Sequence, residues 1–264
     1  MKKGITGHMI VCNEEQWVWY AINSVLKYLD QLIIYDTGST DKTVPIIKSI
    51  SSSIIYFQEM GHVTATQLVD LRNLQIQKTK TDWFLLLDGD EVWPEDSIAE
   101  FALTIRTAPK NLLGIVAKTR VPVGDLYHYQ SEEAGNYHLL GQTGHFNLRG
   151  YRKRVGFRWQ GIYPLEAYCD ESGVPLQNKE KQLLLLKHEY WHLTHLIRSS
   201  TDTHRKLKLE IGTKLHVDLP EVFFKPHSKI VPSAWVKYSV PQKLIAQIFT
   251  PLLHIKRKLL NKST

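Results

Sequence analysis

The sequence predicts an α/β protein with a mainly parallel central sheet that is flanked by helices. Short apolar runs typical of strands alternate with longer helical patterns between residues 5 and 91. Three of these runs end in polar segments that contain acidic residues. Alternation of this kind places helices on both faces of a parallel sheet. A basic amphipathic segment that begins near Pro241 is expected to form a separate C-terminal helix.

The expected elements follow one another in a regular order. Residues 5–12 have the pattern of a first strand, and residues 17–29 show an apolar face with helical spacing. The run QLIIY is short and rich in β-branched residues, which favours a buried second strand. The remaining elements of this half are a third strand, a helix and a fourth strand, at residues 54–57, 66–78 and 83–87.

The second half of the chain is less regular. Residues 112–186 are rich in Gly, Tyr, His and Arg, a composition expected of substrate-facing loops and short strands. Residues 183–211 are expected to be helical. We therefore predict a main domain at residues 1–230 and a basic amphipathic helical segment at residues 231–264.

The C-terminal segment has one apolar and one basic helical face, with Pro251 as the expected site of a kink. One hypothesis is that it lies on an anionic membrane surface, which the basic residues of its last turns favour. The alternative is an ordinary amphipathic helix that covers the core or pairs with a second subunit in a homodimer.

Composition limits the compartment and the partners. The 264 residues carry a formal net charge of +7, which favours an anionic partner such as a nucleotide phosphate or an anionic lipid. The two cysteines, Cys12 and Cys169, make no disulfide framework. Because no secretory signal and no long apolar run is recognisable, we expect a cytoplasmic protein, peripheral on the inner face of the cell membrane if the C-terminal helix binds lipid.

Acidic residues follow the predicted strands. Glu14 lies after the first strand, Asp36 after the second, and Asp88 and Asp90 after the fourth. Since ligands of parallel sheets collect at the carboxyl ends of the strands, these carboxylates are expected to share one site. Two carboxylates one residue apart suit Mg²⁺ or Mn²⁺, which would bridge a diphosphate and neutralise the charge on a leaving nucleotide. An Asp-x-Asp pair alone is also common in solvated acidic turns.

Four motifs in this order, VCNEE, LIIYDTGSTDKT, LRN and WFLLLDGDE, resemble the family-2 glycosyltransferases of the GT-A fold. The resemblance implies transfer of a sugar from a nucleotide-diphosphate sugar, with UDP as the default nucleotide, to an acceptor hydroxyl. It also implies that Arg72 approaches the base or the phosphates, and that Asp88 and Asp90 hold the donor sugar and the metal. The nucleotide pocket would be lined by Cys12, Asn13, Glu14 and Asp36. Ile10 and the pair Asp36-Thr37 depart from the usual pattern and leave the nucleotide open.

The second half is similar to the branch that includes lipopolysaccharide-core glucosyltransferases, which are inverting hexosyltransferases. In LRGYRKRVGFRWQGIYPLEAY, Glu166 stands at the position of the general base. The alternative for Glu166 is a surface carboxylate or a salt bridge to Arg152 or Arg154. In KHEYWHLTHLIRSSTDTHRK, the resemblance implies that His188 contacts the metal or the diphosphate, and that Arg205 or Lys206 contacts the phosphates. The acceptor is then expected to be a lipid-linked or cell-envelope glycan.

Other functions compete with this interpretation. His188-Glu189-x-x-His192 fits the pattern of a zinc metallopeptidase, with His195, His204 or Glu210 as a third ligand. A dehalogenase-type phosphatase also uses Asp-x-Asp, but after its first strand. The basic and aromatic residues between Arg149 and Trp159 could stack nucleic-acid bases, but no recognised module surrounds them and we expect no nucleic-acid partner. A nucleotide- or membrane-binding module without catalysis is the remaining alternative.

Overall fold

The computed structural model describes residues 2–135, 137–201 and 209–260. A nine-stranded sheet forms its centre, in the order β3-β2-β1-β4-β10-β6-β14-β5, with β13 paired to β6. One half is entirely parallel and consists of β3 (Ile55–Glu59), β2 (Gln31–Asp36), β1 (Lys2–Val11) and β4 (Thr81–Leu86). The other half is mixed and consists of β10 (Phe146–Arg152), β6 (Gly114–Arg120), β13 (Leu183–Leu185), β14 (Tyr190–His192) and β5 (Glu91–Val92).

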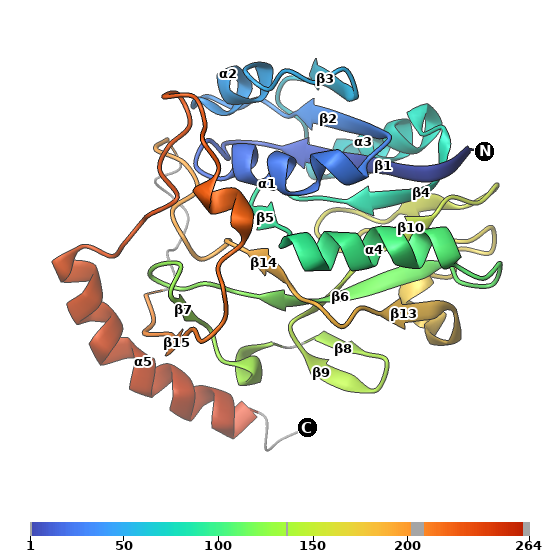
Figure 1. Ribbon diagram of the computed structural model, residues 1–264. Coiled ribbons are helices and arrows are strands. Elements are labelled where there is room, and N and C mark those ends of the chain that lie inside the picture. Colours follow the sequence, from blue (N-terminus) through green and yellow to red (C-terminus); the bar gives the residue numbers. More distant parts are fainter. Residues whose placement is uncertain (1, 136, 202–208, 261–264) are drawn as a thin grey trace.

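Helices cover both faces of this sheet (Figure 1). On one face α1 (Val18–Val25) and α4 (Glu95–Thr107) pack over the largest apolar cluster, and α3 (Ala65–Lys78) covers the other face. The short helix α2 (Thr43–Lys48) follows β2, and α5 (Val240–Leu260) lies at the periphery. The fold class, an α/β protein with a mainly parallel central sheet and a C-terminal helix, is confirmed.

Smaller elements surround the main sheet. Three two-stranded sheets pair β7 (His128–Tyr129) with β15 (Thr213–Lys214), β8 (Tyr137–Leu139) with β9 (Gln142–Gly144), and β11 (Arg158–Gln160) with β12 (Ala167–Cys169). The 3-10 helices are η1 (Leu26–Tyr28), η2 (Glu132–Ala134), η3 (Leu176–Asn178), η4 (Glu180–Gln182) and η5 (Glu221–Phe224).

The prediction of a helix at residues 183–211 is wrong for all the residues of this segment that the structure describes. Leu183–Leu185 and Tyr190–His192 form β13 and β14, both paired in parallel with β6, and turns follow. The four consecutive leucines suit a buried helix or a strand, so only the long-range partner β6 decides between them. Within the described ranges, every helix is too short or too polar to cross a bilayer.

Candidate functional site

The parallel strands β1, β2 and β4 end at the same edge of the sheet, and a cavity of about 350 Å³ opens there. Five of the predicted site residues line it: Cys12, Glu14, Arg72, Asp88 and Asp90. The other lining residues are Ile10, Val11, Thr37, Leu68, Gly89, Tyr163, His192, Thr194 and Arg198. The cavity therefore joins the carboxyl ends of β1 and β4 to α3 and to the segment after β14.

The turn Asp88-Gly89-Asp90 connects β4 to β5 and presses against the segment that follows β1. A Cβ atom on Gly89 would lie 2.9 Å from Cγ of Glu14, so no larger residue fits there without displacing that side chain. The two aspartates of the turn differ in environment. Asp88 keeps a side chain that is 38% exposed, whereas the side chain of Asp90 is 2% exposed. Asp88 can therefore meet a ligand from solvent, while Asp90 lies at the floor of the cavity.

Arg149 neutralises two of the acidic groups. It lies on β10, whose antiparallel register against β4 brings it beside the end of that strand. Its Nη2 donates to Oδ2 of Asp88 at 3.0 Å and also to Oε1 of Glu91, and its Nε donates to the Tyr190 hydroxyl at 3.1 Å. Burial raises the pKa of Glu91 above its ordinary value, although Arg149 opposes this shift. Asp88 and Glu91 thus share one internal cation.

Arg198 neutralises two further acidic groups, those of Asp90 and Glu14. Its Nη1 lies 2.7 Å from Oδ2 of Asp90 and 2.8 Å from Oε1 of Glu14, so it joins the ends of β1 and β4. Burial alone would raise the pKa of Asp90, but His192, 3.4 Å away, and Arg198 together hold this pKa well below its usual range. The pKa of Glu14 is raised by burial and by the nearby Asp90 carboxylate, against the effect of Arg198.

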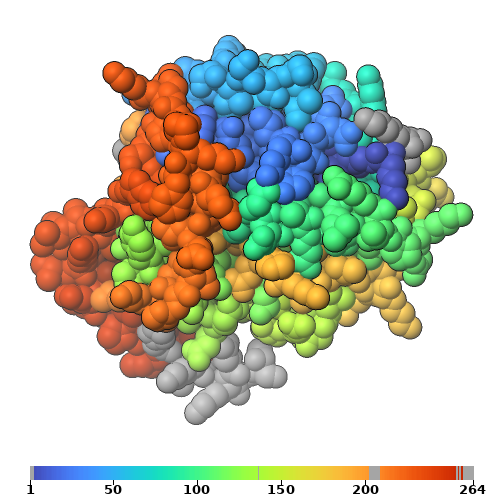
Figure 2. Space-filling model, in the orientation of Figure 1, coloured from blue at the N-terminus to red at the C-terminus, as the bar shows by residue number. Residues whose placement is uncertain are grey.

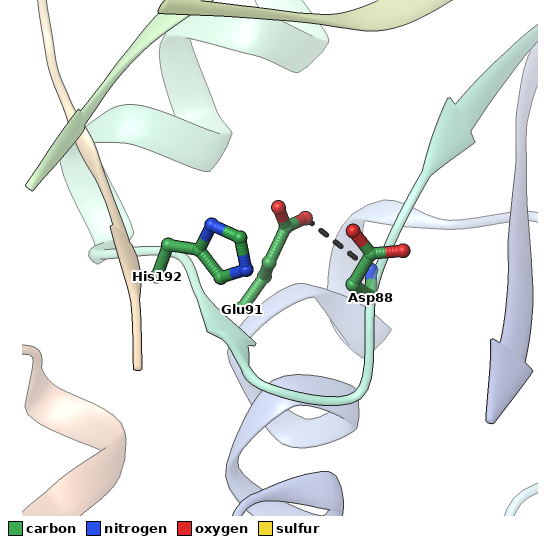
Figure 3. Close-up of side chains that lie close together, drawn as sticks. All are labelled: Asp88, Glu91 and His192. Carbon is green, nitrogen blue, oxygen red and sulfur yellow. Dashed lines mark hydrogen bonds between the residues drawn. The ribbon is translucent and has the colours of Figure 1, made fainter. Parts of the chain in front are cut away.

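His192, and not His188, is the histidine at the acidic turn. Antiparallel pairing of β14 with β5 sets His192 directly opposite Glu91. Ligand atoms of Asp88, Glu91 and His192 lie within 4.8 Å of one another. Figure 3 shows these three side chains close together. Two carboxylates and an imidazole form a donor set that suits Mn²⁺ and, less closely, Mg²⁺. Such an ion would have to displace Arg149 from the two carboxylates.

The structure places the predicted metal ligand His188 elsewhere. Its side chain is 52% exposed, and its Nδ1 lies 2.8 Å from Oε2 of Glu100 on α4. The zinc-peptidase pattern needs two histidines one turn apart on a helix, but here His188 lies in a bend and His192 lies in strand β14. Glu210, one of the three residues considered as a third zinc ligand, pairs with Arg257 of α5 instead. The metallopeptidase alternative is therefore not favoured.

Glu166 lies against Arg72. Nε of Arg72 is 3.0 Å from Oε1 of Glu166, both side chains are at most 10% exposed, and the guanidinium lies 5.1 Å from the Trp159 ring centroid. Asn73, the neighbour of Arg72 on α3, exchanges two hydrogen bonds with the Trp159 backbone and so fastens β11 to that helix. The second oxygen of Glu166 is buried and has no hydrogen-bond partner among the described residues.

The alternative ion pairs of Glu166 are not formed. Arg152 donates to the carbonyls of Pro109 and Leu112, and Arg154 donates to that of Lys110. Both arginines lie at or beyond the end of β10, at the edge of the sheet opposite the cavity, because β10 runs antiparallel to β4.

Asp36 and Asn13 are close to the cavity but do not line it. The Asp36 carboxylate accepts from the N–H groups of Gly38 and Ser39, both at 3.0 Å, and from the Ser39 hydroxyl. Oδ1 of Asn13, which adopts a φ of 55°, accepts from the Thr40 N–H at 2.8 Å. Both side chains thus shape the loop after β2. Arg205, Lys206 and His204, which the sequence also suggested as ligands, lie outside the described residues.

Arg149, Arg198, Glu91, His192 and Tyr163 belong to the site but were not among the predicted residues. A signal existed for three of them. Glu91 directly follows Asp-Gly-Asp, Arg149 is the first residue of the basic segment, and His192 is part of the zinc-peptidase pattern. Arg198 and Tyr163 carried no local signal, because loops far apart in the sequence bring them to the cavity.

Comparison with known proteins identifies a matching family and several relatives. The sequence model of the family described as glycosyl transferase family 2 matches residues 8–167. An uncharacterized glycosyltransferase of Rickettsia bellii is 33% identical over 91 residues, which is 34% of this chain and 29% of that protein. A counterpart in Rickettsia typhi is 35% identical over the same length and shares. The chain therefore matches less than a third of the length of these relatives.

Among solved structures, S. aureus TarS (residues 1–349, crystallised with UDP-GlcNAc) is similar at a TM-score of 0.50 and 16% identity. The match covers 73% of this chain and 58% of the TarS fragment. At this identity the similarity concerns the fold alone, which is the GT-A arrangement of a mainly parallel sheet between helices.

Proposed function

Since the chain belongs to glycosyl transferase family 2, we propose that it moves a sugar, of the hexose type, from a nucleotide-diphosphate sugar to an acceptor hydroxyl. The observation that carries this proposal is the cavity at the carboxyl ends of β1 and β4. It combines the two carboxylates of an Asp-Gly-Asp turn, of which that of Asp90 is buried, with the guanidinium groups of Arg72 and Arg198. Carboxylates can hold a divalent cation, and guanidinium groups are the preferred partners of a diphosphate.

The nucleotide that we propose is UDP, as the four motifs of the first half imply. TarS, whose fold this chain shares, was crystallised with UDP-GlcNAc. We propose that the segments of Cys12, Asn13, Glu14 and Asp36 surround the nucleotide, with Cys12 and Glu14 on the cavity wall and Asp36 and Asn13 shaping the loop behind it.

The donor set fits a divalent cation, Mg²⁺ or Mn²⁺. We propose that Asp88, Glu91 and His192 hold it, and that Asp90, whose carboxylate lies 3.4 Å from the same imidazole, completes the set. Bound there, the ion would supply positive charge to the departing diphosphate. Arg149 and Arg198 then differ in role: Arg149 competes for the same carboxylates, while Arg198 lines the cavity and can turn towards the phosphates.

Glu166 is the general base of the proposal, and the transfer is a direct displacement with inversion. One of its oxygens is held by Arg72, and the other is buried without a partner among the described residues. Glu166 does not itself line the cavity, but Arg72, which holds it, does. We propose that an acceptor hydroxyl bound beside Arg72 reaches this second oxygen and transfers its proton to it. Arg72 would fix the orientation of the carboxylate. The acceptor of the proposal is a lipid-linked or cell-envelope glycan.

The test is thermal stabilisation by a panel of nucleotide-diphosphate sugars, each measured with and without Mn²⁺. A donor at a hundred times its dissociation constant should add about 2.7 kcal/mol to the free energy of unfolding. We expect stabilisation by one UDP-sugar, dependent on the metal, and its loss in Asp90→Asn. The matched control is Asp218→Asn, which changes an exposed aspartate outside the cavity. Stabilisation by no donor would contradict the proposal.

A further inference from the structure

The C-terminal helix α5 is held against the body of the protein by its polar stripe. Nη2 of Arg257 lies 2.8 Å from Oε2 of the buried Glu210, and the Thr250 hydroxyl accepts from the backbone N–H of Ile211 at 2.7 Å. Ala246, on the same side of the helix, is fully buried. Ala246, Thr250 and Arg257 are spaced four and seven positions apart, so they lie along one line of the helix.

The apolar face of α5 points away from the body. Ile248, for example, is 66% exposed and Phe249 is 51% exposed. The other exposed apolar residues of the helix are Val240, Leu244, Ile245, Leu252 and Ile255. A surface helix normally buries its apolar stripe and exposes its polar side. Here the arrangement is reversed, and a contiguous exposed apolar face of this kind marks an interaction site.

Trp235, which shortly precedes α5 in the chain, belongs to a group of exposed aromatic side chains. The Trp235 ring stacks on Tyr127, with centroids 6.3 Å apart, and packs at 5.4 Å against Phe224. All three residues are more than 40% exposed. Aromatic rings that keep one side in solvent are typical of proteins at the interface between lipid and water.

The charge of the segment favours an anionic partner. Residues 240–264 contain no Asp or Glu, and their basic residues are Lys243, Lys256, Arg257, Lys258 and Lys262. Glu210 already pairs with Arg257, which leaves four lysines in the sequence of the segment. A second copy of the chain is a poor occupant of this face, because pairing two such helices would bring like charges together.

We infer that α5 is a membrane-docking helix whose outward apolar face enters the interface of an anionic lipid bilayer. This surface is separate from the proposed transfer chemistry. Figure 1 shows that β1, β2 and β4 point towards the side of the molecule on which α5 lies, and Figure 2 shows part of α5 at the periphery on that side. Docking through α5 would therefore keep the cavity, at the carboxyl ends of those strands, on the side of the protein that meets the bilayer.

Co-sedimentation of the full chain with vesicles tests the inference. The vesicles are phosphatidylcholine alone or phosphatidylcholine with one third phosphatidylglycerol. We expect binding to the anionic vesicles, at least tenfold weaker binding to the neutral ones, and weakening by salt. Ile248→Glu should lower the affinity at least tenfold. Its matched control, Gln247→Glu, adds the same charge at the neighbouring exposed position without removing apolar surface, and should retain more affinity.

Each outcome of these experiments either supports or overturns the inference. Ile248 is not part of the core, so circular dichroism and melting temperature of Ile248→Glu should equal those of the parent protein. Absence of vesicle binding by the parent protein would overturn the inference, as would equal losses in the two variants. So would a parent dimer, measured by light scattering, that Ile248→Glu converts to a monomer without any effect on vesicles. Donor-induced stabilisation, measured in parallel, reports on the transfer site alone and separates failure of the two proposals.

Discussion

Replacing Arg198 by alanine should destabilise the protein strongly, because the change leaves two buried carboxylates without their shared cation. The side chains of Asp90 and Glu14 are 2% and 6% exposed, and Arg198 itself is 13% exposed. Breaking a buried ion pair by removing one partner costs about 3–5 kcal/mol. At about 2 °C per kcal/mol for a chain of this size, we expect the melting temperature to fall by about 6–10 °C.

The assay is thermal and urea unfolding of four proteins: the parent, Arg198→Ala, Asp90→Asn and the double variant. If Arg198 acts mainly as counter-ion to Asp90, its removal should cost at least 1 kcal/mol less once that aspartate is neutral. Arg158→Ala, which removes an exposed arginine on β11, is the matched control and should stay within about 0.5 kcal/mol of the parent.

A divalent cation adds a second arm to the same experiment. Mn²⁺ can supply the positive charge that the carboxylates have lost, so it should stabilise Arg198→Ala more than it stabilises the parent. The reasoning is refuted if Arg198→Ala melts within 2 °C of the parent, or if the double variant shows no coupling. Either result would mean that water and not Arg198 compensates the acidic floor of the cavity.

Four further predictions concern the same site and the core beneath it. Asp90→Asn should abolish transfer while circular dichroism stays unchanged; full activity, or activity indifferent to chelators, would contradict a metal at this turn. His192→Ala should weaken Mn²⁺ binding by at least about tenfold in a titration, whereas His188→Ala should leave it unchanged; equal effects would contradict the assignment of the imidazole. Glu166→Gln should lower kcat by about 10²–10⁴ without changing donor-induced stabilisation, and a loss of donor binding instead would mean that Glu166 only positions Arg72. Burial, with help from Arg72 and Lys153, lowers the pKa of His8 to about 3 in the folded protein, so the contribution of His8 to stability is fully present above pH 6.5 and is lost as the pH falls. Between pH 7.5 and 5.5 the free energy of unfolding of the parent should fall by about 1.4 kcal/mol more than that of His8→Gln. Parallel plots of stability against pH for the two proteins would disprove this.

The first half of the fold could be predicted because its elements are decided locally. Short apolar runs of the right length gave β1, β2 and β4, and polar turns ended them. The acidic residues followed from the same pattern, since parallel strands bring their carboxyl ends to one edge. Residues 183–211 could not be assigned in this way, because their strands exist only through pairing with β6, about 70 residues earlier in the chain.

The pairs within the site depend on tertiary contacts that no local pattern specifies. Arg72 meets Glu166 across 94 residues, and Arg198 meets Asp90 across 108. Which of His188 and His192 lies at the acidic turn is likewise determined by tertiary contacts. As a helix the segment would have presented both histidines together. In the structure His192 lies in β14 opposite Glu91, whereas His188 lies in a bend before that strand and contacts Glu100.

The residues that complete the acidic site lie outside the part of the chain that the family matches. The match ends at residue 167, whereas His192 and Arg198 come from β14 and the loop after it. Residues 8–167 supply the four carboxylates Glu14, Asp88, Asp90 and Glu91, and Arg149 of the same range forms ion pairs with two of them, Asp88 and Glu91. A cluster so acidic and so buried needs further positive charge. Arg198 supplies it in the state described here, and the proposed metal would supply it when the donor binds. If the chain binds the proposed metal and diphosphate, the segment after β14 is therefore where it can adjust their affinity without altering the Asp-Gly-Asp turn itself.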